Sequence, residues 1–389
     1  MSPLASDPPR STDLPLVTIV TPSFNQGRWI RKTLESVAAQ TYSRVEHVVV
    51  DGGSTDETVE ILRSTPGIRW VSEKDRGQAD AINIGISMSS GEFIAYLNSD
   101  DLLYPDAVSI AVDHFRNNPS VDLLYGDGTV IDEYGNALWE WLSRPEDFRL
   151  LADYHFLWND FTNYILQQAT FWRRSLHGRI GFFDENFHYA LDIDFWLRAG
   201  YSGARMLHVP RKMGLFRMIQ GTKSLSSPIV FWPDYLELFR RYRGARHIGA
   251  YVEQFLYEAM SKAGLSIDDA SSLYRNIFEG RWAGLEETER AVLLAAGLAA
   301  RGPAFILLAD EAWQRGDVAE ARRLRAEALK YGRHALLRPR SIGHLLKSAS
   351  GPAAPAVRRA WEWGVISYRS HRYRKRYRIA ERNAAKGAS

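Results

Sequence analysis

Residues 16–130 alternate between short apolar runs typical of buried strands and segments whose apolar residues recur at helical spacing. Strands are expected at 16–20, 46–50, 68–71, 92–97 and 121–125, with helices between them. Consecutive parallel strands need a crossover connection, which is usually a helix. The alternation therefore predicts an α/β fold with a mostly parallel sheet flanked by helices.

After Pro228 the pattern changes to helices alone, and residues 309–331 indicate a helical hairpin around Gly316-Asp317. No second copy of this hairpin recurs at a fixed period, so a solenoid is not predicted. The expected organisation is a disordered N-terminus (1–13), an α/β domain (14–228), a helical region (229–350) and a basic aromatic tail (351–389).

The 389 residues include no cysteine, which excludes disulfide frameworks and thiolate metal sites. The first 15 residues lack the apolar segment of a secretory signal. The longest run of small apolar residues, 291–300, is too short to span a membrane. We therefore expect a soluble cytoplasmic protein.

The tail carries an uneven share of the charge. Residues 357–389 contain ten Lys or Arg against two Glu, a local charge of +8, whereas the whole chain carries +3. Interleaved aromatic and basic residues favour peripheral attachment to an anionic membrane surface on the cytoplasmic face, with a solvated tail as the alternative. No nucleic-acid module precedes the tail, so nucleic acid is not an expected partner.

The expected strand 92–97 ends at Asn98-Ser99-Asp100-Asp101. Adjacent carboxylates at a strand end repel each other unless a cation or donor groups neutralise them. Their oxygens suit Mg²⁺ or Mn²⁺ together with a phosphate-bearing substrate. The structural alternative is that Asp101 caps the following helix.

Three further motifs each have a functional and a structural interpretation. Asp51, before Gly52-Gly53-Ser54, accepts a base N–H or forms a turn, and Ser54 with Glu57 predicts a capping box. Arg76, just before the helix expected at 78–88, binds phosphate or is a solvated charge. In a helix, Asp192 and Asp194 face different ways, so only one of them is expected to enter the site, where a carboxylate can act as a general base. The structural alternative is that one of the pair caps the helix.

Taken together, five segments in order resemble the family 2 inverting glycosyltransferases of bacterial glycan and polysaccharide biosynthesis, which have the GT-A fold. The segments are 20–25, 50–56, 77–85, 98–101 and 191–198, and the resemblance covers roughly residues 14–225. It implies a nucleotide-diphospho-sugar transferase fold followed here by the helical region.

The resemblance implies a role for each matching position. Asp192 is the implied catalytic base, and Asp100 the metal ligand that holds Mn²⁺ or Mg²⁺, with Asp101 as support or second ligand. The implied nucleotide-sugar-binding residues are Thr21, Pro22, Asp51, Arg76, Asn83, Asn98, Ser99 and Asp100. The implied acceptor or phosphate contacts are Gln168, Trp196 and Lys223. Ile219 stands where many relatives carry a histidine.

The implied reaction is transfer of a sugar, with inversion, from a nucleotide-diphosphate sugar, UDP being favoured, to a glycan or lipid-linked acceptor. Two other classes remain as alternatives. A nucleotidyltransferase would need a Gly-rich, Lys-containing signature after the first strand, and residues 21–25 do not supply one. A non-catalytic sugar-nucleotide-binding scaffold would not need Asp100 and Asp192.

Overall fold

The structure is a computed structural model, and it describes residues 14–143, 148–152, 165–219 and 228–332. The chain divides into two compact units, residues 1–247 and 248–389. The helix Trp232–Arg243 (α8) thus belongs to the first unit, although the helical region was expected to begin at residue 229. The expected N-terminal segment 1–13 and the tail lie outside the described residues.

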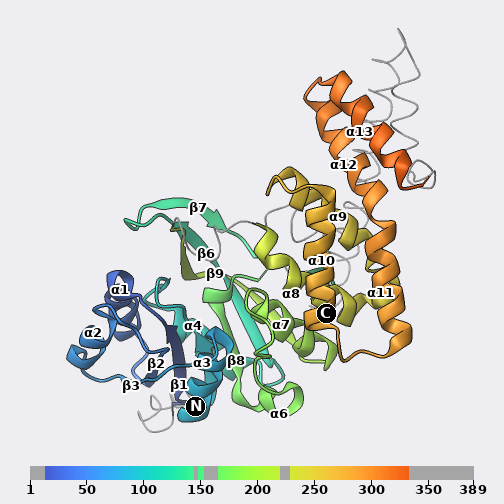
Figure 1. The fold of residues 1–389 in the computed structure, drawn as a ribbon. Helices are drawn as coiled ribbons and strands as arrows, with labels where there is room; N and C mark the ends of the chain where they lie inside the picture. Colours follow the sequence, from blue (N-terminus) through green and yellow to red (C-terminus); the bar gives the residue numbers. More distant parts are fainter. Residues whose placement is uncertain (1–13, 144–147, 153–164, 220–227, 333–389) are drawn as a thin grey trace, which may run out of the picture. The chain divides into compact units, whose positions relative to one another are not determined.

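The first unit is built on one mixed sheet in the order β3-β2-β1-β4-β8-β6-β9-β5, with β7 paired to β6 (Figure 1). Its strands are β1 (Val17–Ser23), β2 (Val45–Asp51), β3 (Arg69–Ser72), β4 (Phe93–Tyr96), β5 (Leu102–Leu103), β6 (Leu123–Ile131), β7 (Ala137–Trp141), β8 (Thr170–Arg173) and β9 (Met206–Arg217). Its α-helices are α1 (Gly27–Ala38), α2 (Thr58–Ser64), α3 (Gln78–Met88), α4 (Ala107–Asn117), α6 (His177–Ile180), α7 (Leu191–Tyr201) and α8.

The five expected strands are present and correspond to β1, β2, β3, β4 and the start of β6. β1 to β4 pair in parallel, as the alternation predicts. The other half of the sheet is mixed, because β8 enters antiparallel between β4 and β6 while β9 runs parallel to β6. The result is an α/β fold whose parallel half was predicted and whose second half was not.

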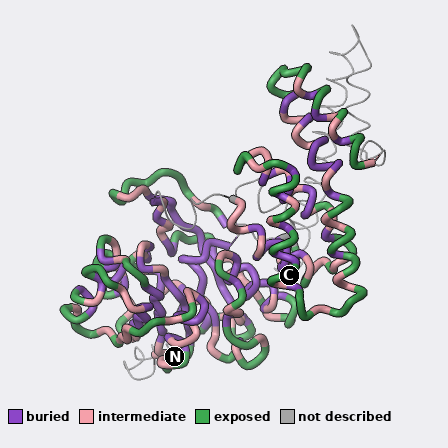
Figure 2. Tube along the Cα trace, viewed as in Figure 1, coloured by how far each residue is buried: buried purple, intermediate pink, exposed green. Residues whose placement is uncertain are grey.

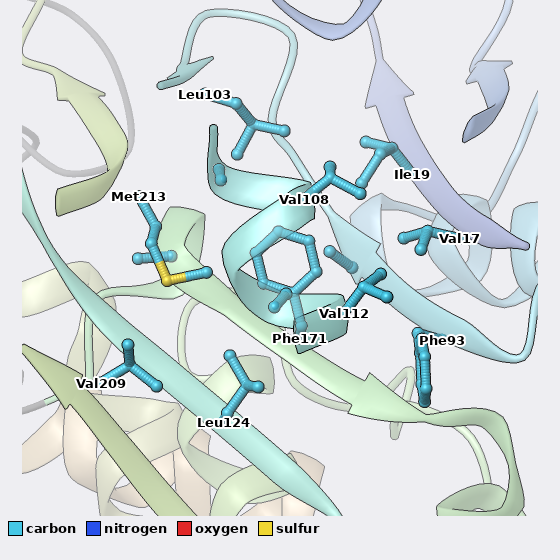
Figure 3. Close-up of a cluster of buried hydrophobic side chains, with 14 of the residues drawn as sticks. Val17, Ile19, Phe93, Leu103, Val108, Val112, Leu124, Phe171, Val209 and Met213 are labelled. Atoms are coloured by element: carbon cyan, nitrogen blue, oxygen red, sulfur yellow. The ribbon is translucent and has the colours of Figure 1, made fainter. Parts of the chain in front are cut away.

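Helices cover both faces of the sheet. On β2, Val49 packs with α1 and α2, whereas its neighbours Val48 and Val50 pack with Ala81 of α3 on the other face. A large apolar cluster lies where α4 packs across β1, β4, β6 and β8 (Figure 3). Figure 2 shows that the centre of this sheet is buried, and β1, β2, β4, β6 and β8 are buried along most of their length.

One local prediction was wrong. Ser54 and Glu57 form no capping box, because the Ser54 hydroxyl donates to Asp51 instead. The carboxylate of Asp56 accepts from the N–H groups of Thr58, at 3.0 Å, and Gly27, at 2.9 Å, and so joins the starts of α2 and α1.

The second unit is helical: α9 (Gly249–Ser261), α10 (Ile267–Arg281), α11 (Glu287–Ala299), α12 (Arg301–Gln314) and α13 (Val318–Lys330). α12 and α13 form the predicted hairpin, and the Asp317 side chain caps α13. Residues Glu287–Gln314 are apolar and long enough to cross a membrane by length and composition, a test that buried core helices of soluble proteins also pass. This stretch is longer than the run 291–300 considered from sequence.

We expect Gly85→Ala to destabilise the first unit. A Cβ at Gly85 in α3 would lie 2.3 Å from Cγ1 of the buried Val20, so β1 and α3 must shift apart. Overpacking of this kind costs about 1–3 kcal/mol. Chemical denaturation should show the loss, whereas Gly178→Ala, where a Cβ meets nothing within 4 Å, should cost nothing. Equal stability of the two variants would contradict this packing.

We expect stability to fall in acid partly through His47. Burial lowers the pKa of His47 to about 4, from 6.5. Between pH 6.5 and pH 4 His47 binds more protons in the unfolded chain than in the folded chain. The free energy of unfolding therefore keeps the whole contribution of the neutral His47 above pH 6.5 and loses it progressively as the pH falls toward 4. His47 accounts for about 2 kcal/mol of the fall in the free energy of unfolding between pH 7 and pH 5. Denaturation at both pH values should show a smaller fall for His47→Gln; an identical fall would contradict the assignment.

Candidate active site

The two carboxylates at the end of β4 have different surroundings. Asp101 is buried, and its carboxylate accepts three hydrogen bonds: from the Arg217 backbone N–H at 2.8 Å, Asn98 Nδ2 at 3.1 Å and Gln168 Nε2 at 2.6 Å. Burial raises the pKa of Asp101 well above its usual value, and the charge of Asp100 adds to the shift. Asp101 is therefore anchored by the protein itself.

Asp100 is half-buried, and within the described residues no other residue donates a hydrogen bond to its carboxylate. Burial raises the pKa of Asp100, and the nearby charge of Arg217 opposes the shift. A carboxylate that lies beside a second one and receives no hydrogen bond from another described residue is an oxygen ligand suited to a divalent cation.

Arg217, the last residue of β9, binds the loop at the end of β4. Arg217 had no role in the sequence-based predictions. Besides its N–H to Asp101, its Nε donates to the Asp100 carbonyl at 2.8 Å. Its Nη1 lies 3.2 Å from the carbonyls of Asp132 and Glu133, and the guanidinium lies 5.3 Å from the centre of the Trp29 ring. Burial lowers the pKa of Arg217. The available signal was a single arginine at the end of an apolar run.

Side-chain amides also hold the loop at the end of β4 through hydrogen bonds. Gln78 Nε2 donates to Asn98 Oδ1 at 2.7 Å, and Gln167 Nε2 donates to the Tyr96 carbonyl at 2.6 Å. The Asn98 amide thus links the start of α3 to Asp101. Gln168, implied as an acceptor contact, is buried against Asp101. Ser99 is also buried, and its carbonyl lies 2.9 Å from Oγ1 of Thr33.

The first two strands of the chain end beside each other. Asp51 is buried and accepts from the N–H groups of Gly53 and Ser54 and from the hydroxyls of Ser54 and Ser72. Ser23, its partner across the β1–β2 ladder, has a buried hydroxyl with no partner among the described residues. An orphaned buried hydroxyl at a strand end is a candidate ligand contact that the sequence did not single out.

Thr21 and Pro22 are buried in β1, and Thr21 Oγ1 lies 2.9 Å from His47 Nε2. Arg76 pairs with Asp80 at 2.7 Å and with Glu185 at 2.8 Å, and these acidic partners raise its pKa.

Asn83 both donates to and accepts from the Phe183 backbone, each at 2.9 Å. Both Asn83 and Arg76 therefore fasten the segment 183–185 to α3.

Asp192 and Asp194 differ as their spacing predicts. Asp194 is fully buried and accepts from Arg198 Nε at 2.7 Å and the Tyr242 hydroxyl at 2.8 Å, an internal ion pair. Asp192 is half-buried at the second position of α7. Burial raises the pKa of Tyr96 well above its usual value, and the charges of Asp192 and Asp101 add to the shift.

Three other implied positions differ in accessibility. Trp196 is 2 % exposed and lies in the core, so in this conformation it presents no surface to an acceptor. Ile219 is buried. Lys223 lies outside the described residues.

The residues fit a divalent cation held by few protein ligands. Within the described part of the chain, no three His, Cys, Asp or Glu side chains gather into a metal cluster. Mg²⁺ is commonly bound through one or two carboxylates together with substrate phosphates, and Asp100 alone can supply that ligand.

Comparison with known proteins shows the family of this chain. The sequence profile described as Glycosyl transferase family 2 matches residues 18–181. Chondroitin synthase of Escherichia coli is 34% identical over 152 residues, which span 37% of this chain but 22% of that protein. A PGL/p-HBAD biosynthesis glycosyltransferase of Mycobacterium bovis is 34% identical over 205 residues, 50% of this chain and 75% of that one.

Among solved structures, Staphylococcus aureus TarS aligns with 80% of this chain and 55% of that one, at 17% identity and a TM-score of 0.49. The family assignment depends on the sequence matches instead. With its mixed sheet flanked by helices on both faces, this is a GT-A-type transferase fold, and the chain belongs to glycosyltransferase family 2.

Proposed function

We propose that this glycosyltransferase moves a sugar from a nucleoside-diphosphate sugar, with UDP as the favoured nucleotide, to a glycan or lipid-linked acceptor, with inversion. One observation carries the proposal. Asp101 is anchored by three donors while no other residue of the described chain donates to the carboxylate of Asp100 beside it, and the charges of Asp192 and Asp101 both add to the rise that burial causes in the pKa of Tyr96.

The proposed nucleotide pocket lies at the ends of β1 and β2. Asp51 accepts four hydrogen bonds, three of them at Oδ2, so Oδ1 retains a lone pair for the N3–H of uracil. The orphaned Ser23 hydroxyl is a further contact for the nucleotide. Thr21 and Pro22 would form the floor of the pocket.

On the diphosphate side, Asn98, Ser99 and Asp100 are the proposed contacts. Arg76 and Asn83 remain predicted sugar-nucleotide contacts, although they already bind the 183–185 segment. Lys223 remains a predicted phosphate contact.

Asp100 would hold Mn²⁺ or Mg²⁺, with Asp101 supporting it through the shared loop. A divalent cation bound there would take up charge that develops on the departing diphosphate. Asp101 keeps Asp100 in place because its own carboxylate is fixed by β9 and by the Gln167–Ala169 turn.

The proposed chemistry is a single displacement. Asp192 accepts the proton of the acceptor hydroxyl while that oxygen forms a bond to the anomeric carbon. The bond from this carbon to the diphosphate oxygen breaks, and the nucleoside diphosphate leaves with the bonding pair. One attack from the opposite face inverts the anomeric configuration. Holding the two reactants in line can lower the barrier by roughly 7–11 kcal/mol.

Names of relatives support the acceptor class, since one is a chondroitin synthase and another acts in PGL/p-HBAD biosynthesis. Gln168 and Trp196 remain predicted acceptor-side residues, although both are buried. Attachment of residues 357–389 to an anionic membrane surface remains a prediction about residues outside the described ones.

We expect Asp100→Asn to remove the effect of Mn²⁺ on donor binding, because a neutral amide is a poor ligand for a hard cation. In Mn²⁺, UDP affinity should fall at least about tenfold, and without the metal it should not change. Calorimetric titration measures both, with Asp106→Asn, an exposed carboxylate paired with Arg211, as the control. Wild-type affinity in Mn²⁺ would contradict the assignment.

We expect Asp192→Asn to bind UDP normally and to lose transfer by roughly 10²–10⁴-fold, because the amide cannot accept the proton. A donor panel scored for nucleoside diphosphate release measures this, and pyrophosphate release would instead indicate a nucleotidyltransferase. Asp194→Asn serves as a contrast, since removing a buried ion-pair partner should lower thermal stability. Near-normal turnover by Asp192→Asn would refute the role of the base.

A further inference from the structure

The segment 183–190 leads directly into α7 and is fastened on one side to α3. Asn83 bonds both backbone groups of Phe183, and Arg76 pairs with Glu185. Farther along, a Cβ on Gly77, which caps α3, would lie 3.9 Å from Nδ1 of His188. α3 thus fastens the start of this segment, and the N-cap residue of α3 lies near His188.

The other side is held by α8, which lies beyond the part of the chain matched by the family profile. Oδ2 of Asp234 accepts three successive backbone N–H groups, those of His188 at 2.8 Å, Tyr189 at 2.6 Å and Ala190 at 3.1 Å. Asp234 is 2 % exposed. Converging N–H groups form a concave site for an anion, and bonds to a charged oxygen are stronger than neutral ones.

α8 also holds α7 and the start of this segment at other points. The Tyr242 hydroxyl donates to Asp194, and Arg241 pairs with Asp184 at 2.7 Å. Ala190 is the N-cap residue of α7 and lies two residues before Asp192, so the Asp234 contact holds the backbone on the N-terminal side of the proposed base, while the Tyr242 contact holds Asp194 two residues after it.

We propose that Asp234 is a positioning residue for Asp192: its carboxylate fixes residues 188–190 and thereby sets where the base meets the acceptor hydroxyl. This inference rests on the proposed function. Asp234 itself touches backbone groups of the segment and does not act on the substrate. A misplacement of about 1 Å in such a group can cost about 10²-fold in rate.

The test compares Asp234→Asn with Glu237→Gln. Asparagine keeps the shape and one acceptor oxygen but removes the charge. Glu237 is the matched control, because it is a buried carboxylate on the same helix that bonds Arg240 and Arg241, and Arg241 in turn pairs with Asp184 at the start of the segment rather than with residues 188–190. UDP affinity in Mn²⁺, kcat for nucleoside diphosphate release from the donor selected by the panel, and thermal stability are measured for each.

For Asp234→Asn we expect a fall in kcat of about tenfold or more with UDP affinity unchanged within about twofold. Adding Asp234→Asn to Asp192→Asn should cause no further loss, because a residue that acts through the base has nothing left to position. Glu237→Gln should keep the wild-type kcat even where its stability falls.

Wild-type kcat in Asp234→Asn, with Asp192→Asn inactive, would overturn this inference and leave the proposed function intact. An equal fall in kcat for Glu237→Gln, or an additive loss in the double variant, would indicate a merely structural role and would also overturn it. Full turnover by Asp192→Asn would overturn both.

Discussion

The structure of this site depends on a conflict between two neighbouring carboxylates in a buried loop. Charged groups of like sign cannot both lose water unless each is compensated. The chain compensates Asp101 with three donors drawn from the loop itself, the Gln167–Ala169 turn and β9. Segments more than 100 residues apart must therefore meet for the loop to close, and Asp100 is left as the carboxylate that a bound cation can satisfy.

The segment that leads into α7 is held in a different way. The proposed base is carried at the start of a helix whose preceding segment is bonded to α3 and to α8. Most of these bonds go to backbone groups, so they fix the path of the chain rather than any one side chain. Placing a catalytic group on a braced helix start gives better control of its position than a free loop would.

Local pattern predicted the parts of the fold that depend on local interactions. β1 to β4 and their helices follow from periodicity and from the crossover rule, and the difference between Asp192 and Asp194 follows from helical geometry. The antiparallel entry of β8 and the long β9 depend on pairing between distant segments, which no local pattern contains. For the same reason the sequence did not predict three sets of contacts: those of Gln168 with Asp101, those of Arg217 with the loop after β4, and the hydrogen bonds of Asp234 to residues 188–190.

The central claim is that a cation site at Asp100 and the carboxylate of Asp192 face one donor-binding cavity. A crystal structure with UDP and Mn²⁺, using the anomalous signal of manganese, tests it most directly. The account predicts a manganese peak bonded to Asp100 and to diphosphate oxygens, with the carboxylate of Asp192 across the space where the sugar would lie. A manganese peak away from Asp100, or an Asp192 carboxylate facing a different surface from the diphosphate, would contradict it.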